Sequence, residues 1–417
     1  MPRSLLGLAV LLSLAWLASA DRKRVPWRMI LGGLGLQFAI AALMLKVPVF
    51  SGLFMALNRL VLAMEQATRA GTAFVFGYLG GGPLPFAEPR PGAGFILAFQ
   101  ALPLVIVIAA LTALLYYWRV LPYVVRGFSF VLRKTMGIGG ALGVGASGTI
   151  FLGMIEAPLL IRPYLAQLTT SELFAMMATG MSCIAGTMLM LYATVLTGVI
   201  PDALGHILTA SVIHAPAALA VAALMQPETG PPTLGMEIPP SPAKGSMDAI
   251  ATGTWDGLQL FLNILAMLIV CIALVTLTNL GLATLPDVPG LGGTPLTLQR
   301  ALGWILAPMA WLLGIDWSEA HAAGSLLGTK IVLNEFIAFI DLANLPVAAL
   351  SERTRLILAY AMCSFANFGS VGILIGGMGT LCPERRTEIA GLGMRALLAG
   401  AIASLMTGAV IGVLFPG

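Results

Sequence analysis

Long stretches with almost no charged side chain recur along the whole sequence and limit what the chain can fold into. Charged residues make up 10% of the 417 residues and apolar residues 59%, whereas a typical soluble domain is roughly 25% charged. Each apolar stretch of about 20 residues is long enough to cross the ~30 Å hydrocarbon layer as a helix. The composition therefore predicts an all-α polytopic membrane protein. It argues against a soluble enzyme, a disordered protein and a nucleic-acid binder.

About eight transmembrane helices are predicted from these stretches. Their residue ranges are 5–20, 29–47, 94–117, 173–197, 203–225, 251–278, 353–380 and 388–415. Three further helices are predicted outside the spans: one lying along the surface over 51–72, a basic amphipathic helix over 119–134 and a short helix over 298–313. We expect the basic helix to lie on the cytoplasmic face, because cationic amphipathic helices are attracted to anionic headgroups.

The first apolar run, Leu5–Ala20, can be read in two ways. Its basic start and small-residue end resemble a cleavable signal peptide. The alternative is a retained span followed by a cytoplasmic loop, since four basic residues follow within 22–28. We favour the retained span, which places the N-terminus on the periplasmic side of a bacterial-type inner membrane.

Two apolar segments, 136–166 and 318–346, do not have the pattern of simple spans. Each is rich in small residues and carries one glutamate, Glu156 or Glu335, inside apolar sequence. Each glutamate is followed by a Ser-Glu pair and then by a cysteine. The interval between the two cysteines equals that between the two glutamates to within one residue. We interpret these segments as parts of an internal repeat.

The number of spans between the two glutamates predicts that the repeat is inverted. Three proposed spans separate them, and an odd number of crossings makes the second copy enter from the opposite side. Inverted repeats with broken helices are typical of secondary transporters, because irregular backbone is tolerated at that depth only where it lines a polar cavity. Four regions are predicted. They are the N-terminal spans, which form a scaffold (1–135), a first repeat with one re-entrant hairpin (136–225), a linker with a span and an interfacial helix (226–316), and a second repeat with the other hairpin (317–417).

Polar residues inside these segments are the candidate site. Asn367 and Ser370 are three residues apart among glycines, so they share a helix face. Ionisable groups inside a membrane are costly and usually functional, which favours a functional role for Glu156 and Glu335. The structural alternatives are an Asn that only binds a neighbouring helix and a carboxylate paired with a basic residue such as Lys330.

At these residues the sequence resembles the concentrative nucleoside transporter family. The matching phrases are Gly153–Leu165, Asn334–Phe336 and Ser364–Ser370, and the resemblance extends over nearly the whole chain. It implies eight spans with two re-entrant hairpins and an elevator-like movement of a transport domain against a scaffold. It also implies a homotrimer in the lipid bilayer that imports nucleosides by cation symport, with no cofactor and no nucleic-acid partner.

The resemblance also implies which residues bind the substrate. Glu335, Asn367 and Ser370 should hold the ribose, which fits because a carboxylate accepts from vicinal hydroxyls and an amide both donates and accepts. Phe365 should pack near the sugar or gate the site, and Glu156 should meet the base edge. The complete set of expected substrate-binding residues is Gly153, Met154, Ile155, Glu156, Asn334, Glu335, Phe365, Asn367 and Ser370.

Met154 and Ile155 stand where the family phrase has Gln and Thr. Losing a buried polar partner costs about 1–3 kcal/mol, so recognition of the base must rest on Glu156, backbone groups and apolar stacking. The preference between pyrimidine and purine stays open, and so does an unusual or modified nucleoside as substrate.

Thr149 and Cys183 stand where the family has an Asn and a Ser of its sodium site. Sodium prefers hard oxygen ligands, and a thiol is a poor one. We favour a proton as the coupling ion, with Glu156 or Glu335 as its carrier, because a carboxyl group in a low-dielectric cavity binds a proton more readily. The alternative is sodium bound by Thr149 and backbone carbonyls.

Two other functions are alternatives to symport. A passive uniporter or channel of the same fold is compatible with the altered cation positions. An intramembrane enzyme is disfavoured, because the sequence has no GxSxG motif at depth, no HExxH motif and only three scattered histidines.

Overall fold

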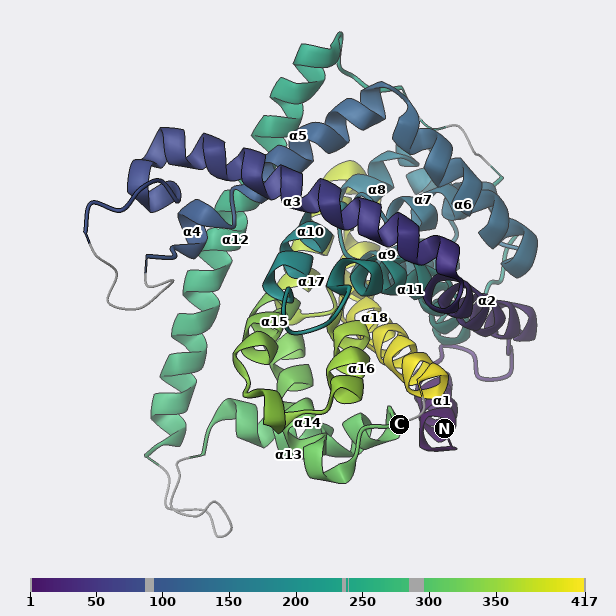
Figure 1. Cartoon of the computed structure of the whole chain (residues 1–417). Helices are drawn as coiled ribbons and strands as arrows, with labels where there is room; N and C mark the ends of the chain where they lie inside the picture. Colours follow the sequence, from purple (N-terminus) through teal and green to yellow (C-terminus); the bar gives the residue numbers. More distant parts are fainter. Residues whose placement is uncertain (1, 87–93, 235–237, 239, 285–295, 416–417) are drawn as a thin grey trace.

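The computed structural model describes residues 2–86, 94–234, 238, 240–284 and 296–415. All regular secondary structure in these residues is helical (Figure 1). Four of the described segments are long and apolar enough to cross a membrane unaided. They are α2 (Trp27–Lys46), α4 with α5 (Leu97–Gln100 and Leu104–Tyr117), α11 (Ala203–Met225) and α18 (Arg386–Leu414). These match predicted spans.

The remaining predicted spans are shorter, interrupted or longer helices. The first is α1 (Pro2–Leu17), and α12 (Ser246–Leu282) contains the span predicted over 251–278. The span predicted over 173–197 is two helices, α9 (Thr170–Ser182) and α10 (Gly186–Val195). The span predicted over 353–380 is likewise two helices, α16 (Glu352–Met362) and α17 (Phe368–Leu381). The expected broken spans are therefore present in both repeats.

Both predicted hairpins are present, but they differ in form. The second consists of α14 (Trp317–Val332) and α15 (Glu335–Asn344). The first consists of α7 (Gly140–Gly148), irregular backbone, the short α8 (Glu156–Leu159) and a 3-10 helix, η2 (Arg162–Gln167). Its returning arm contains Pro158 and Pro163, and proline cannot donate the hydrogen bonds that a continuous helix needs.

The interfacial helices predicted from the sequence are also present. Figure 1 shows α3 (Pro48–Phe76) lying across the bundle at a steep angle to α12. α6 (Val120–Met136) is the basic amphipathic helix, and α13 (Leu298–Leu312) precedes α14 at a bend of 118°. The other short elements are η1 (Gly77–Gly80), η3 (Val347–Ala349) and η4 (Pro383–Arg385).

The centre of the bundle is α11, which is 94% buried over its apolar window. It packs against α2, α9 and α18, and α18 in turn packs against α9, α16 and α1. On another side of the molecule, α12 packs along α5 (Figure 1). Gly253 and Gly257 allow this close approach, because a Cβ on either would lie 2.8 Å or less from atoms of α5. The first hairpin contacts this buried central helix through α7, the first broken span through α9 and α10, and the second broken span through α16.

Candidate functional site

The Glu335 carboxylate lies where three helices meet. Glu335 is the first residue of α15 and is 4% exposed. The Tyr192 hydroxyl of α10 donates a hydrogen bond to Oε1 at 2.5 Å, and Asn367 Nδ2, at the start of α17, donates to Oε2 at 2.9 Å. Both carboxylate oxygens are thus hydrogen-bonded by residues from both repeats.

The starts of α15 and α17 orient this site. Asn334 caps α15 by accepting from the Ile337 N–H at 2.9 Å, and Asn367 caps α17 by accepting from the Ser370 N–H at 2.8 Å. Because Asn367 Oδ1 serves the cap, its Nδ2 group faces Glu335. A helix N-terminus carries partial positive charge, so two helix ends favour a carboxylate here. Residues 363–367 and 333–334 leave the helical conformation to place them.

Lys330, near the end of α14, is almost fully buried and interacts electrostatically with Glu335. The two side chains, both in the described part of the chain, form no direct ion pair. The alternative in which Glu335 serves only as a salt-bridge partner of Lys330 does not match this geometry.

Tyr192 is a site residue that the sequence reasoning missed. It is fully buried, and its ring lies 6.2 Å from that of Phe336 and 5.1 Å from that of Phe339, centroid to centroid. A buried tyrosine hydroxyl usually has a hydrogen-bond partner. A tyrosine deep in the predicted span 173–197 is therefore a sequence feature that could have indicated a polar site.

Glu156 faces a different space from Glu335. It opens α8 and lines a cavity of about 520 Å³ between the first hairpin, α5, α12 and residues 240–243. Asp256, Arg162 and Tyr116 also line this cavity, and Glu335 is not among its lining residues. The structure thus places the two glutamates in one bundle without direct contact between them.

The tip of the first hairpin packs against both broken spans. The Gly186 N–H, at the start of α10, donates to the Phe151 carbonyl at 2.8 Å. Gly153 adopts φ +92°, which favours glycine, and a Cβ there would lie 2.9 Å from Ala185 Cβ. α10 then continues from this contact to Tyr192, so one helix connects the hairpin tip to the Glu335 site.

The two residues that depart from the family phrase pack against protein. Met154 is 6% exposed and lies against Gly180 of α9, while the half-buried Ile155 lies against Gly377 of α17. Phe365, in the break between α16 and α17, is half-buried, and its carbonyl accepts from the Asn367 N–H at 2.8 Å. Phe365 is therefore adjacent to the ribose candidates in the chain.

Thr149 and Cys183 are both buried beside α11. The Thr149 hydroxyl donates to the Ala146 carbonyl at 2.8 Å, and the Cys183 thiol lies 3.7 Å from the Ser211 carbonyl. The Ser211 hydroxyl donates to the Ile150 carbonyl at 3.1 Å. Three carbonyl oxygens around this position thus already accept from protein groups.

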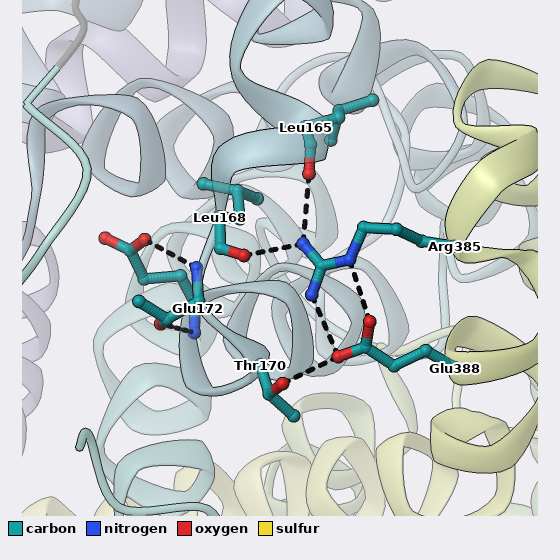
Figure 2. Close-up of polar contacts among 7 residues, drawn as sticks. Leu165, Leu168, Thr170, Glu172, Arg385 and Glu388 are labelled. Atoms are coloured by element: carbon teal, nitrogen blue, oxygen red, sulfur yellow. Dashed lines mark hydrogen bonds and ion pairs between the residues drawn. The ribbon is translucent and has the colours of Figure 1, made fainter. Parts of the chain in front are cut away.

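Arginines fix the bases of both hairpins. Figure 2 shows Arg385 donating to the carbonyls of Leu165 and Leu168, at 3.2 and 2.6 Å, while it forms an ion pair with Glu388 at 2.8 Å. Arg355 plays the same part after the second hairpin. It donates to the carbonyls of Leu342, Leu345, Pro346 and Leu350. Each hairpin is therefore held by an arginine at the end of its returning arm.

Comparisons with known proteins agree with this architecture. Three family models match the chain. They are described as "Na+ dependent nucleoside transporter C-terminus" (residues 206–412), "Na+ dependent nucleoside transporter N-terminus" (residues 6–79) and "Nucleoside recognition" (residues 98–197). An uncharacterized transporter of Haemophilus influenzae is 38% identical over 98% of this chain and 97% of its own. The nucleoside permease NupC of Helicobacter pylori is 34% identical over 98% and 97%.

Two solved structures of the transporter CNTnw are also similar. One, in an inward-facing substrate-bound state, has a TM-score of 0.88 at 35% identity and covers 99% of this chain and 98% of its own. A doubly substituted variant in an outward-facing state has a TM-score of 0.90 at 35% identity and covers 99% and 96%. The resemblance of the motif phrases is thus confirmed over the whole length. The chain belongs to the concentrative nucleoside transporter family, whose members are integral membrane transporters and not enzymes.

Proposed function

We propose that this protein imports nucleosides by cation symport, with an elevator-type movement that exposes one site alternately to each side. The observation that supports this most directly is the Glu335 carboxylate, which is buried and held by Tyr192 and Asn367. An ionised carboxylate has about four lone-pair sites, and two of them are used here. Two remain for the vicinal hydroxyls of a ribose.

We assign the nucleobase to the part of the site around Glu156. The Glu156 carboxylate accepts N–H groups of the base from its cavity, and Leu152 and Leu159 of the same cavity supply apolar packing in place of hydrogen bonds. Met154 and Ile155 do not line this cavity. Ser370, buried in the first turn of α17, and Phe365 complete the ribose side. Glu335 does not line the Glu156 cavity, so this assignment requires the two spaces to join when a nucleoside binds and bridges the two repeats.

For the coupling ion we propose a proton, carried by Glu156 or Glu335. The support is the arrangement at Thr149 and Cys183, where a soft thiol and already engaged carbonyls offer sodium few hard oxygen ligands. Sodium is the second candidate, because the matching family model is described as Na+ dependent. A passive uniporter is the remaining alternative.

We propose further that the protein is a homotrimer in a bacterial-type inner membrane, with its N-terminus in the periplasm. In this arrangement residues 1–135 and α12 form the scaffold, and the regions 136–225 and 317–417 move against it. The packing of α12 along α5 supports the first grouping. The packing of α7 against α9, and of α14 and α15 against α16, supports the second.

Uptake by purified protein in proteoliposomes tests these proposals. Radiolabelled uridine and adenosine are supplied with an imposed sodium gradient, an imposed proton gradient or neither. Accumulation above the external concentration with the proton gradient alone is expected. Accumulation only with the sodium gradient would show that sodium, not the proton, is the coupling ion. Equilibration of the nucleoside without either gradient would show that the protein is a passive uniporter. Absence of saturable uptake would refute nucleoside transport.

The role of Glu335 is tested by Glu335→Gln with a control on the same helix. Glu335→Gln should abolish ribonucleoside uptake, because a neutral amide offers the hydroxyls one acceptor oxygen instead of two. Asp341→Asn, which also removes one carboxylate charge from α15, should retain uptake. Near-normal transport by Glu335→Gln, or equal loss in both variants, would contradict the ribose role.

A further inference from the structure

A second, smaller cavity lies where α5 ends and α6 begins. Its volume is about 150 Å³, and two guanidinium groups line it, from Arg119 and Arg126. Two tyrosines, Tyr116 and Tyr123, and the hydroxyl-bearing Ser241 also line it. All lining residues belong to the described part of the chain, and none of them is acidic. The cavity therefore concentrates positive charge with hydrogen-bond donors beside it.

The two guanidinium groups have no anionic partner within the described chain. Arg126 lies 5.8 Å from the ring centroid of Tyr123, and neither Arg119 nor Arg126 takes part in an ion pair with the described residues. Arg126 follows Arg119 by seven positions in the chain, and both side chains line this cavity. Guanidinium groups bind phosphate through paired N–H donors, so two at one cavity fit a phosphate group.

The backbone at Arg119 adds an independent observation. Arg119 has φ +62° and ψ +9°, a left-handed conformation that few residues other than glycine, Asn and Asp adopt. This residue makes the turn between α5 and α6 and carries its side chain to the cavity. Strained backbone of this kind is typical of functional positions.

The position of the cavity on α6 indicates where the phosphate comes from. α6 buries one face, including Val125 and Leu132, while Phe130 is 63% exposed and Lys134 lies 5.8 Å from its ring centroid. A helix with aromatic and basic residues outside its buried face lies in the headgroup region of a bilayer. The phosphate groups concentrated at that depth belong to phospholipids.

We propose that the cavity at Arg119 and Arg126 binds the phosphate of an anionic phospholipid headgroup. The cavity also adjoins the substrate space. Tyr116, Pro240 and Ser241 line both it and the cavity of about 520 Å³ that contains Glu156. A bound headgroup therefore contacts one wall of the Glu156 cavity, and its effect on uptake rests on the proposed function, whereas its binding does not.

Lipid retention by the purified transporter tests binding without any transport assay. Full-length protein in detergent is incubated with phosphatidylglycerol, phosphatidylcholine or inorganic phosphate. Native mass spectrometry then counts bound lipids, and thermal melting measures stabilisation. Phosphatidylglycerol should be retained and should raise the melting temperature, while phosphatidylcholine and inorganic phosphate should not. Equal stabilisation by inorganic phosphate, or equal retention of phosphatidylcholine, would overturn the proposal.

Two variants and one control assign the effect to the cavity. Arg119→Gln with Arg126→Gln should lower phosphatidylglycerol retention at least tenfold. Arg119→Gly should lower it severalfold while folding at least as well as the parent, because glycine adopts φ +62° freely. Arg22→Gln with Lys23→Gln removes the same charge from an exposed loop outside this cavity. Unchanged retention in the cavity variants, or equal loss in this control, would refute the site.

Discussion

Replacing Asn367 by Asp separates two roles that one side chain plays. Asn367 Oδ1 caps α17 through the Ser370 N–H at 2.8 Å, and Nδ2 donates to Glu335 at 2.9 Å. Aspartate keeps the cap, because Asp and Asn are equally good N-cap residues. It loses the donor, and an oxygen then faces the Glu335 carboxylate instead.

The expected loss follows from the hydrogen bond that disappears. A hydrogen bond to a charged group contributes about 1.5–3 kcal/mol, and 1.4 kcal/mol is a factor of about ten. Initial uridine uptake by Asn367→Asp in proteoliposomes should therefore fall by roughly 10- to 150-fold. The free energy of unfolding should fall by a similar amount, about 1.5–3 kcal/mol, and Asn367→Ala, which loses cap and donor together, should be destabilised by about 0.5–2 kcal/mol more.

The pH dependence gives this prediction its sharpest test. When pH is lowered, one proton shared between the two carboxyl groups restores an O–H donor between them, as in paired carboxylates. The uptake of Asn367→Asp relative to the parent protein should therefore rise as pH falls. A ratio that stays constant across the pH series, or an Asp variant that melts as early as the Ala variant, would refute the reasoning.

Three further predictions follow from other contacts. Tyr192→Phe keeps the ring packing and removes the 2.5 Å hydrogen bond to Glu335, so uptake should fall about tenfold or more and the melting temperature should fall with it; uptake kinetics and thermal melting check it. Thr149→Asn combined with Cys183→Ser replaces a thiol by hard oxygen ligands. Uptake by this variant should become sodium-stimulated, as measured with imposed gradients. Arg385→Gln leaves two carbonyls without their donor, and it should lower the free energy of unfolding by about 1–3 kcal/mol, measured by thermal melting.

The broken spans and hairpins were predictable because their signals are local. Residues 361–377 combine glycines with Asn367 and Ser370, and a polar N-cap among glycines in an apolar segment indicates a helix that restarts there. Pro158 and Pro163 account for the short pieces in which the first hairpin returns, a form that the sequence-based expectation of a re-entrant hairpin did not specify. The predicted division into regions rests on the same local signals and stays a prediction.

The contacts that complete the site were not predictable from local pattern. Tyr192 and Glu335 come from different repeats, and their hydrogen bond depends on how α10 crosses the start of α15. The same applies to Glu156, whose cavity is formed mainly by α5, α12 and residues 240–243 from outside the repeats. Repeat symmetry relates the two glutamates in sequence, but the surrounding scaffold gives them different environments.

The anchoring of the hairpins gives them an uneven stiffness along their length. Arg385 and Arg355 hold the bases through two and four carbonyl contacts. At the tip of the first hairpin the Phe151 carbonyl accepts from the Gly186 N–H, the Phe151 ring packs against Phe128, and Met154 and Ile155 lie against glycines. A hairpin that is held at its base is displaced most easily at its tip. Displacement by an entering solute should thus be concentrated at the tips, which can part from the broken spans while the bases stay in place.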